Sequence, residues 1–203
     1  NPHHTLNLNY LMNRTGNRRT DEVDSDFIPS NDVFAKHTLG LSYSQSFVED
    51  RWQNTFFVKN YTNYLHVEQQ ELPWITGSRE VRGAATKNHT GYGLATRYAF
   101  PSDAIAVKAS YEHSLRLPRS RELLGNGTTV YANLLLRPEN SHNINLGLFG
   151  ALRPAPGHRL DYELNAFYRD VKDYIRLVVS ETEGTSQYDN VPGVGIKGLE
   201  GEL

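Results

Sequence analysis

The sequence of 203 residues contains no cysteine, one methionine and two tryptophans. Without cysteine, the chain holds no disulfide framework and no cysteine-ligated zinc or redox centre. Its longest apolar run has four residues, at 104–107, so the sequence predicts no transmembrane helix. A formal net charge of −2 provides no basic footprint for binding nucleic acid. What the chain does have is 12 tyrosines, a composition that favours β-structure.

The dominant pattern is an alternation of apolar residues with polar or small ones, at a period of two. In the segment 35–47, Leu39 and Leu41 alternate with Gly40 and Ser42. The same alternation recurs at 92–100 and 160–169. No stretch of ten residues shows the three- and four-residue spacing of an amphipathic helix. The chain is therefore predicted to be all-β.

Strands and connections follow a regular order along the chain. Eight strands are predicted, at 5–12, 34–47, 54–68, 89–100, 105–115, 142–152, 160–180 and 188–203. Long polar connections at 13–33, 69–88 and 116–141 alternate with short ones at 48–53, 101–104 and 153–159. Long loops on one rim and short turns on the other are typical of transmembrane β-barrels. We predict an antiparallel meander of about eight strands, part of a large transmembrane β-barrel.

The composition of the strand faces supports a barrel. The polar faces are often small and uncharged, which suits a crowded, hydrated interior, whereas a soluble sandwich shows a charged face to water. Aromatic residues near strand ends, among them Phe47, Tyr98, Phe100 and Tyr168, are predicted to form girdles at the membrane interfaces. On pattern alone, a soluble β-sandwich stays open as an alternative.

Four motifs follow one another between residues 107 and 203. They are Leu115–Arg116–Leu117–Pro118 with Glu122–Leu123, then 133–136 with Arg137–Pro138–Glu139, then 141–148, and a strand pair formed by 166–175 with 188–203. In this order they resemble the barrel domain of TonB-dependent outer-membrane receptors. Asn145 stands where an acidic residue is commoner in the third motif. Residues 1–106 agree with that family only in the rhythm of strands and loops.

This resemblance implies that residues 1–203 are a partial TonB-dependent receptor β-barrel, with the plug domain and the terminal strands absent. Receptors of this family form barrels of about 22 strands around a plug. The parent protein would import a scarce nutrient across the bacterial outer membrane, most often a ferric siderophore, haem, a cobalamin or a glycan. Its partners would be the transported ligand (an iron chelate is expected), outer-membrane lipid, and TonB acting through the plug. For this segment the resemblance implies no enzymatic activity, no cofactor and no metal.

Six charged residues are candidates for facing the ligand or the plug: Arg97, Glu112, Arg116, Arg119, Arg121 and Glu122. The last four lie where the first motif strand enters its loop. Arginine suits anionic ligands because its planar guanidinium binds carboxylate or phosphate through two parallel bonds. An arginine–glutamate network that only fixes the barrel wall explains the same residues equally well. Haem receptors of the family often carry a histidine in this loop, and 116–139 contains none, which disfavours haem.

The last strand pair is predicted to extend beyond the membrane. The charged insert 169–173 is costly in lipid, since a lipid-facing Lys or Arg costs roughly 2–4 kcal/mol at the midplane. The strand should therefore leave the membrane near Tyr168 and continue as an extracellular ribbon, with Tyr174 close to Asn190 or Val194. Gly195 and Gly198 are expected to ease the curvature of the returning strand.

Other features predict no separate chemistry. The segment 193–198 spells the G-x-G-x-x-G pattern of dinucleotide-binding proteins, but a period-two segment follows it, so a glycine-rich strand is predicted instead. His3 and His4 would point to opposite faces of a strand, which disfavours a metal site. Two other classes of protein stay open. One is a complete eight-stranded outer-membrane barrel, acting as a lipid-modifying enzyme or adhesin, and the other is a soluble β-sandwich binding module.

Overall fold

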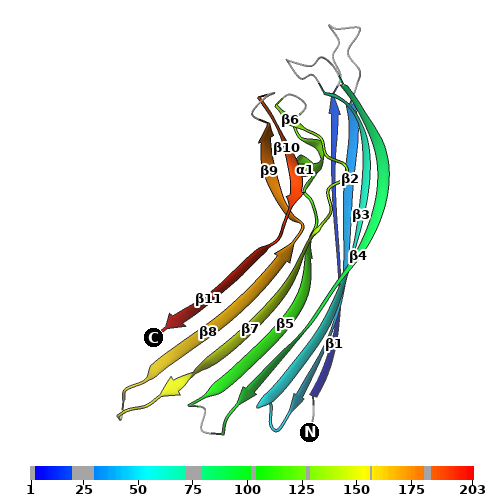
Figure 1. Cartoon of the computed structure of the whole chain (residues 1–203). Coiled ribbons are helices and arrows are strands. Elements are labelled where there is room, and N and C mark those ends of the chain that lie inside the picture. Colours follow the sequence, from blue (N-terminus) through cyan, green and yellow to red (C-terminus); the bar gives the residue numbers. More distant parts are fainter. Residues whose placement is uncertain are drawn as a thin grey trace.

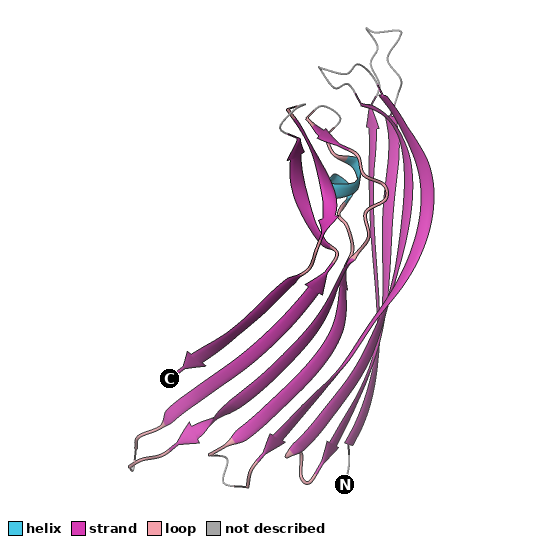
Figure 2. Ribbon diagram, in the orientation of Figure 1, coloured by secondary structure: helices cyan, strands magenta, loops and turns pink. Residues whose placement is uncertain are grey.

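The computed structural model describes residues 3–19, 30–71, 79–101, 104–126, 129–155, 157–180 and 184–203. In these parts the chain forms an open, curved antiparallel sheet with a small group of elements at one end (Figure 1). Figure 2 shows that strands account for nearly all of the regular structure. The predicted all-β meander is thus confirmed. No helix in these parts is long and apolar enough to cross a membrane.

Eight strands build the main sheet. In spatial order they are β1 (His3–Arg19), β2 (Ser30–Phe47), β3 (Trp52–Glu71), β4 (Arg79–Ala99), β5 (Ala106–Arg116), β7 (Glu139–Leu152), β8 (Leu160–Lys172) and β11 (Val194–Glu202). A second sheet has the order β6 (Val130–Tyr131), β10 (Thr185–Val191) and β9 (Tyr174–Ser180). The helix α1 (Ser120–Leu124) lies between β5 and β6.

The main sheet does not close on itself. Among the described residues, β1 pairs only with β2, and β11 pairs only with β8. A complete eight-stranded barrel requires its first and last strands to pair, and a sandwich requires a second large sheet facing the first. Neither alternative fits this arrangement.

Several strand ends differ from the prediction. Strands β1 to β4 extend into the predicted loops 13–33 and 69–88, whose remaining residues, 20–29 and 72–78, lie outside the described residues. The alternation of apolar residues ends there, but cross-strand hydrogen bonds between polar side chains continue, as between Thr62 Oγ1 and Asn88 Oδ1 at 2.7 Å. Sequence patterns based on apolar residues therefore ended these strands too early.

The last predicted strands are each divided in two. The outgoing strand breaks at Asp173, whose backbone adopts a left-handed conformation with φ 54°. Beyond this break, β9 and β10 pair with Val191 opposite Tyr174, beside Asn190, as predicted. The strand β11 pairs with β8 in a continuous register. Among its glycines, however, Gly195 has open space around it, whereas a Cβ on Gly198 would contact the Phe167 ring at 2.5 Å, so only Gly198 relieves crowding as expected.

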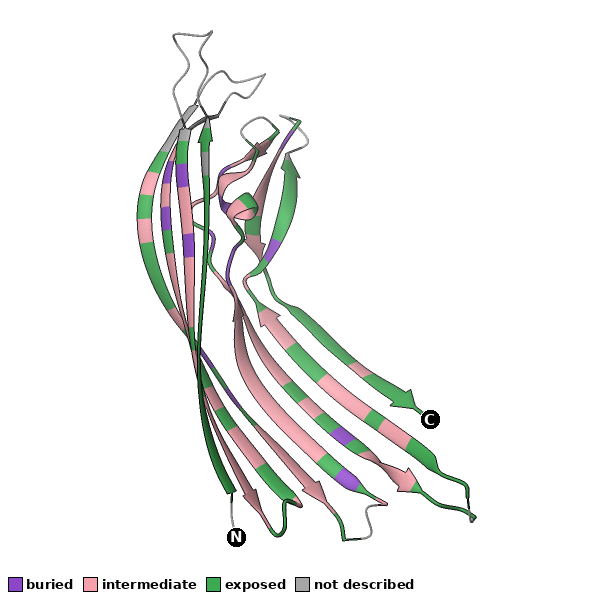
Figure 3. Cartoon of the chain, turned by 180° about the vertical axis from the view of Figure 1, so that it is seen from behind, coloured by how far each residue is buried: buried purple, intermediate pink, exposed green. Residues whose placement is uncertain are grey.

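The two faces of the main sheet differ in chemistry. On β2, Leu39 and Leu41 are exposed and lie on the face opposite the small elements at the end of the sheet. We call this the outer face, and Figure 3 shows the alternation of exposed and half-buried residues along the strands. Its exposed aliphatic residues include Leu6, Leu8, Val58, Leu94, Val107, Ile144, Leu146, Leu148 and Leu164. The register brings them into neighbouring rows, which we call the apolar belt.

Aromatic side chains border the apolar belt, as predicted. At the rim of the short turns, Phe47 packs on Trp52 with ring centroids 5.8 Å apart, and Tyr98 packs on Phe100 at 5.1 Å. At the rim of the long loops, Tyr168 is exposed beside Ile144. Trp and Tyr at such levels are characteristic of strands that cross a bilayer.

Candidate ligand-facing cap and inner wall

The elements beyond the long-loop end of β5 form a cap, defined here as residues 117–126 and 129–138 together with β9 and β10. The cap lies against the inner face of β2 to β4 (Figure 1). Six buried residues form the core between them: Leu65 and Val67 from β3, and Leu123, Ala132, Leu136 and Ile175 from the cap. At about 25 cal/mol per Å² of apolar surface removed from water, burial of these side chains holds the cap to the wall.

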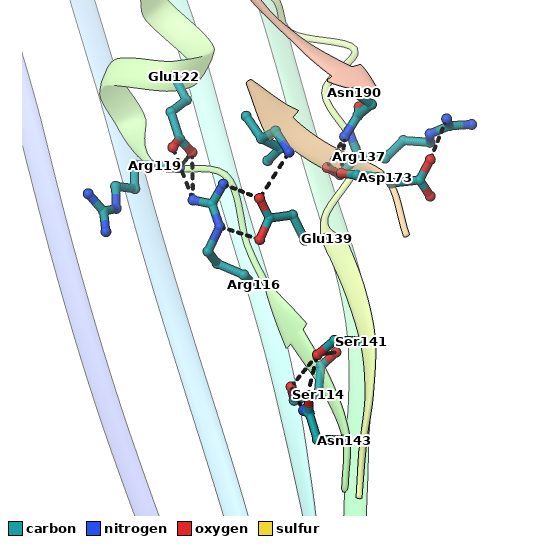
Figure 4. A network of polar contacts seen from close by, with 11 residues as sticks. Ser114, Arg116, Arg119, Glu122, Arg137, Glu139, Ser141, Asn143, Asp173 and Asn190 are labelled. Carbon is teal, nitrogen blue, oxygen red and sulfur yellow. Dashed lines mark hydrogen bonds and ion pairs between the residues drawn. The ribbon is translucent and has the colours of Figure 1, made fainter. Parts of the chain in front are cut away.

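Arg116 is the central residue of the cap's attachment to β5 (Figure 4). Its guanidinium donates two hydrogen bonds to Glu122, at 3.0 and 3.1 Å, and contacts both carboxylate oxygens of Glu139 at 2.7 Å. Glu122 also accepts the backbone N–H of Arg119 at 2.8 Å, and Glu139 accepts the N–H of Ile175 at 2.9 Å. Arg116 therefore joins β5 to α1 and β7, and Glu139 extends the connection to β9.

The electrostatics of this cluster follow from its burial. The side chains of Glu122 and Glu139 are only 12% and 10% exposed. Burial by itself raises the pKa of Glu139, but hydrogen bonds from Arg116 and from the Ile175 N–H outweigh it and hold that pKa below its usual range. The hydrogen bond to Glu139 raises the pKa of Arg116, despite the opposing effect of burial. All of these groups lie beyond the apolar belt, at the long-loop end of the strands.

A second set of hydrogen bonds closes the cap. The Asn190 side chain accepts the backbone N–H of Arg137 at 2.8 Å, and its amide donates to the carbonyls of Arg137 and Asp173, at 3.0 and 2.7 Å. The Arg137 guanidinium contacts the Asp173 carboxylate at 2.6 Å. Asn133 donates to the carbonyl of Tyr188 at 2.9 Å. The loop of the second motif is thereby fixed to the β9–β10 ribbon.

Two of the predicted site residues are exposed on the surface of the cap. Arg119 precedes α1 and Arg121 lies within it, and both are exposed. Figure 4 shows the Arg119 side chain directed away from the Glu122 carboxylate. Within the described parts of the chain, neither guanidinium has a hydrogen-bond or ion-pair partner, whereas that of Arg116 is fully engaged. These two arginines can therefore bind an anion without breaking an existing contact.

The other two predicted residues lie on the inner face, within the level of the belt. Arg97 stacks over the Phe149 ring with its guanidinium carbon 5.2 Å from the ring centroid, and Glu112 contacts Lys59 at 3.6 Å. Lys108 also forms an ion pair with Glu163. The structure thus brings Arg116, Arg119, Arg121 and Glu122 together around α1, and it places Arg97 and Glu112 separately, further down the wall.

Sequence reasoning missed three of the residues that organise the cap: Glu139, Asn133 and Asn190. Glu139 and Asn133 belong to the second motif, so the resemblance contained the signal, but no local pattern paired Glu139 with Arg116, 23 positions away. Asn190 lies in a strand where asparagine is generally disfavoured. An asparagine at a strand position was therefore the one indication in the sequence that this side chain forms structural hydrogen bonds.

Comparisons with known proteins agree with this architecture. Residues 74–203 match the family described as TonB dependent receptor-like, beta-barrel. A Serratia marcescens hemophore receptor, HasR, solved with its hemophore HasA and heme, is similar at a TM-score of 0.69 and 17% identity, over 98% of this chain and 36% of that one. The copper transporter OprC is similar at a TM-score of 0.74 and 18% identity, over 98% of this chain and 32% of that one.

The chain therefore spans about a third of the length of these two structures. At such low identity they establish the fold and not the ligand. No curated protein matches the chain. The family match covers more than half of the sequence, and the strands, the belt and the cap agree with it. The chain belongs to the TonB-dependent receptor family, whose members are transporters, and it is a section of an outer-membrane β-barrel.

Proposed function

We propose that residues 1–203 form part of the barrel wall, and a ligand-contacting cap, of a receptor that imports a ferric siderophore with energy from TonB. The plug and the remaining strands of the barrel would come from other parts of the parent protein. The segment itself would bind and position the ligand, without catalysing a reaction. This chain covers about a third of two solved structures with the same fold, which supports the proposal that it is one part of a longer receptor.

One observation carries the choice of ligand. Arg119 and Arg121 are exposed and unpaired among the described residues, next to a cluster that holds α1 in place. A pair of exposed arginines on a firmly held segment suits an anionic chelate bearing carboxylate or catecholate oxygens. The cap loop 116–139 has no histidine to serve as an axial ligand of haem iron, which favours the siderophore over haem.

Ligand binding to the purified parent receptor tests this proposal. Quenching of tryptophan fluorescence would be titrated with a ferric catecholate, a ferric citrate-type carboxylate, haem and Cu²⁺. The double variant Arg119→Ala/Arg121→Ala should weaken binding of the ferric chelate at least tenfold, because each charge-assisted hydrogen bond contributes ~1.5–3 kcal/mol.

The matched control is Arg159→Ala, at the opposite rim. Its guanidinium pairs with Asp161, and this variant should leave chelate affinity unchanged. Binding of haem or Cu²⁺ with no binding of either ferric chelate would refute the siderophore. An unchanged affinity in the double variant would instead refute the role of the two arginines.

A further inference from the structure

Four aromatic side chains from three strands gather on the outer face of the main sheet. They are Tyr92 from β4, Tyr111 and His113 from β5, and His142 from β7, and we call them the histidine cluster. The ring centroids of His113 lie 5.0 Å from those of both Tyr92 and His142, and Tyr111 lies 6.1 Å from His142. The cluster shares no residue with the cap or with the inner wall.

Strand register places the cluster at the long-loop edge of the apolar belt. The row formed by Leu94, Tyr111, Ile144 and Tyr168 is the last with a large aliphatic residue on each of β4 and β7. The next row toward the long loops holds Tyr92, His113, His142 and Asp170. Beyond it, the outer face becomes polar, with Asn140 opposite Lys172. In a bilayer, this is the depth of the lipid headgroups.

The hydrogen bonds of the cluster leave donors for a ligand. The Tyr111 hydroxyl lies 2.8 Å from His142 Nδ1. When this hydroxyl donates, Nδ1 is the acceptor and the proton of the imidazole is on Nε2. The Nδ1 atom of His113 is buried and has no partner in the described structure. Keeping that atom unprotonated avoids burying an unpaired N–H, so the proton of His113 is also assigned to Nε2.

The surroundings of the cluster favour an anion over a metal ion. The described residues contain no group of three or more His, Cys, Asp or Glu arranged to hold a metal. Asp170 is the acidic neighbour in the same row. Lys172 lies one row above on β8, and Lys197 pairs with Tyr168 one row below, so two lysines outnumber the single carboxylate. Imidazole N–H groups flanked by ammonium groups are suited to phosphate oxygens.

We propose that the histidine cluster, with Lys172 and Lys197, binds the phosphate of a lipid headgroup in the outer leaflet of the outer membrane. The aliphatic rows below the cluster would contact the acyl chains of the same lipid. This lipid site would depend on the outer face and the depth of the cluster, and not on which nutrient the receptor carries.

The chain offers a matched control at the other rim. His4 Nδ1 lies 2.8 Å from the Tyr43 hydroxyl, the same type of pair on the same face, but next to the short turns. The two tyrosine–histidine pairs share this hydrogen bond and the outer face, but they lie at opposite rims of the sheet. His4→Phe should leave outer-leaflet lipid binding unchanged, whereas changes in the cluster should reduce it.

The test uses the parent receptor in phosphatidylcholine nanodiscs containing bisphosphorylated lipid A or its dephosphorylated form, with bound lipid counted by native mass spectrometry. The variant His113→Phe/His142→Phe keeps the rings and removes the nitrogen donors. It should bind bisphosphorylated lipid A about tenfold less tightly than the wild type and should bind the dephosphorylated lipid equally well. The variant His113→Lys/His142→Lys restores nitrogen donors and should recover most of the affinity.

Equal binding of bisphosphorylated lipid A by wild type and by the phenylalanine variant would overturn the proposal. An equal loss for both lipids would also overturn it, because the cluster would then contribute only apolar contact. If circular dichroism shows that the phenylalanine variant does not fold, Lys172→Ala/Lys197→Ala provides the same comparison at exposed positions. Unchanged binding of the phosphorylated lipid by that variant would equally contradict a phosphate site.

Discussion

The substitution Glu139→Gln tests whether the Arg116 cluster holds the cap to the barrel wall. The glutamine has nearly the same shape as the glutamate, so the packing of the 10%-exposed side chain is preserved. Its amide oxygen can still accept the Ile175 N–H and one arm of the Arg116 guanidinium. Its NH₂ group, however, replaces the oxygen that faces Arg116 Nε, and two donors then oppose each other.

The expected magnitude follows from this single lost contact. A hydrogen bond to a charged group contributes about 1.5–3 kcal/mol, and the 36% exposure of the Arg116 side chain favours the lower part of that range. We expect the free energy of local opening of the cap to fall by about 2 kcal/mol. Amide exchange in β9 and β10 should then accelerate about 30-fold, since 1.4 kcal/mol corresponds to tenfold.

Hydrogen–deuterium exchange of the parent receptor, followed by mass spectrometry, measures this effect. Peptides from β9 and β10 should exchange faster, while those from β5 and β8 within the apolar belt should not change. The control Glu163→Gln removes the partner of Lys108 on the inner wall and should leave the cap unaffected. Unchanged exchange of β9 and β10 in Glu139→Gln, or equal acceleration throughout the barrel, would contradict the assigned role of the cluster.

Three further results are expected. Because the pKa of Glu139 is lowered in the folded state, its contribution to cap stability is present above the ordinary glutamate pKa of about 4.3. That contribution is lost as the pH falls through the lower pKa of the folded state. Amide exchange of the cap, measured against pH, should show this acid step in the wild type and not in Glu139→Gln. Gly193→Ala should lower the stability of the receptor against urea, because its Cβ would clash with the Val171 carbonyl. Gly195→Ala, with open space around it, should have no effect. Equal effects of the two substitutions would contradict the close approach of the chain at Gly193 to Val171. Since the chain has no cysteine, Tyr174→Cys/Val191→Cys should form a disulfide on oxidation, and failure to cross-link would contradict the β9–β10 register.

The sheet could be predicted from the sequence because its strands follow a single rule. Alternation with period two and the order of long and short connections were sufficient to identify the eight strands of the main sheet. The positions where they end could not be predicted, because beyond the belt the strands are held by backbone pairing and by polar pairs such as Thr62 with Asn88. Residues of that kind are equally common in loops, so their sequence does not distinguish the two states.

The cap shows why resemblance and local pattern gave different kinds of information. The motif residues Arg116, Glu122 and Glu139 were recognisable as a set, yet their pairing depends on a loop of more than twenty residues that returns to the start of β7. No local spacing encodes such a return. The short helix α1 also has only five residues, too few for a helical period to appear in the sequence.

The geometry supports different roles, within the proposed function, for the arginines of the first motif, which the sequence left undecided between ligand binding and support of the wall. Arg116 lies among carboxylates that are almost buried, and withdrawing it to bind a ligand would leave Glu122 and Glu139 without their cation, at a cost of several kcal/mol. Arg119 and Arg121, a few residues later, carry no such cost, because their guanidinium groups are exposed. In the proposed function, a cap that binds an anion therefore needs both kinds of arginine: one that fixes α1 against the wall, and two at the start of α1 that would contact the ligand. Exchanging their environments would lose the support of the helix as well as its binding surface.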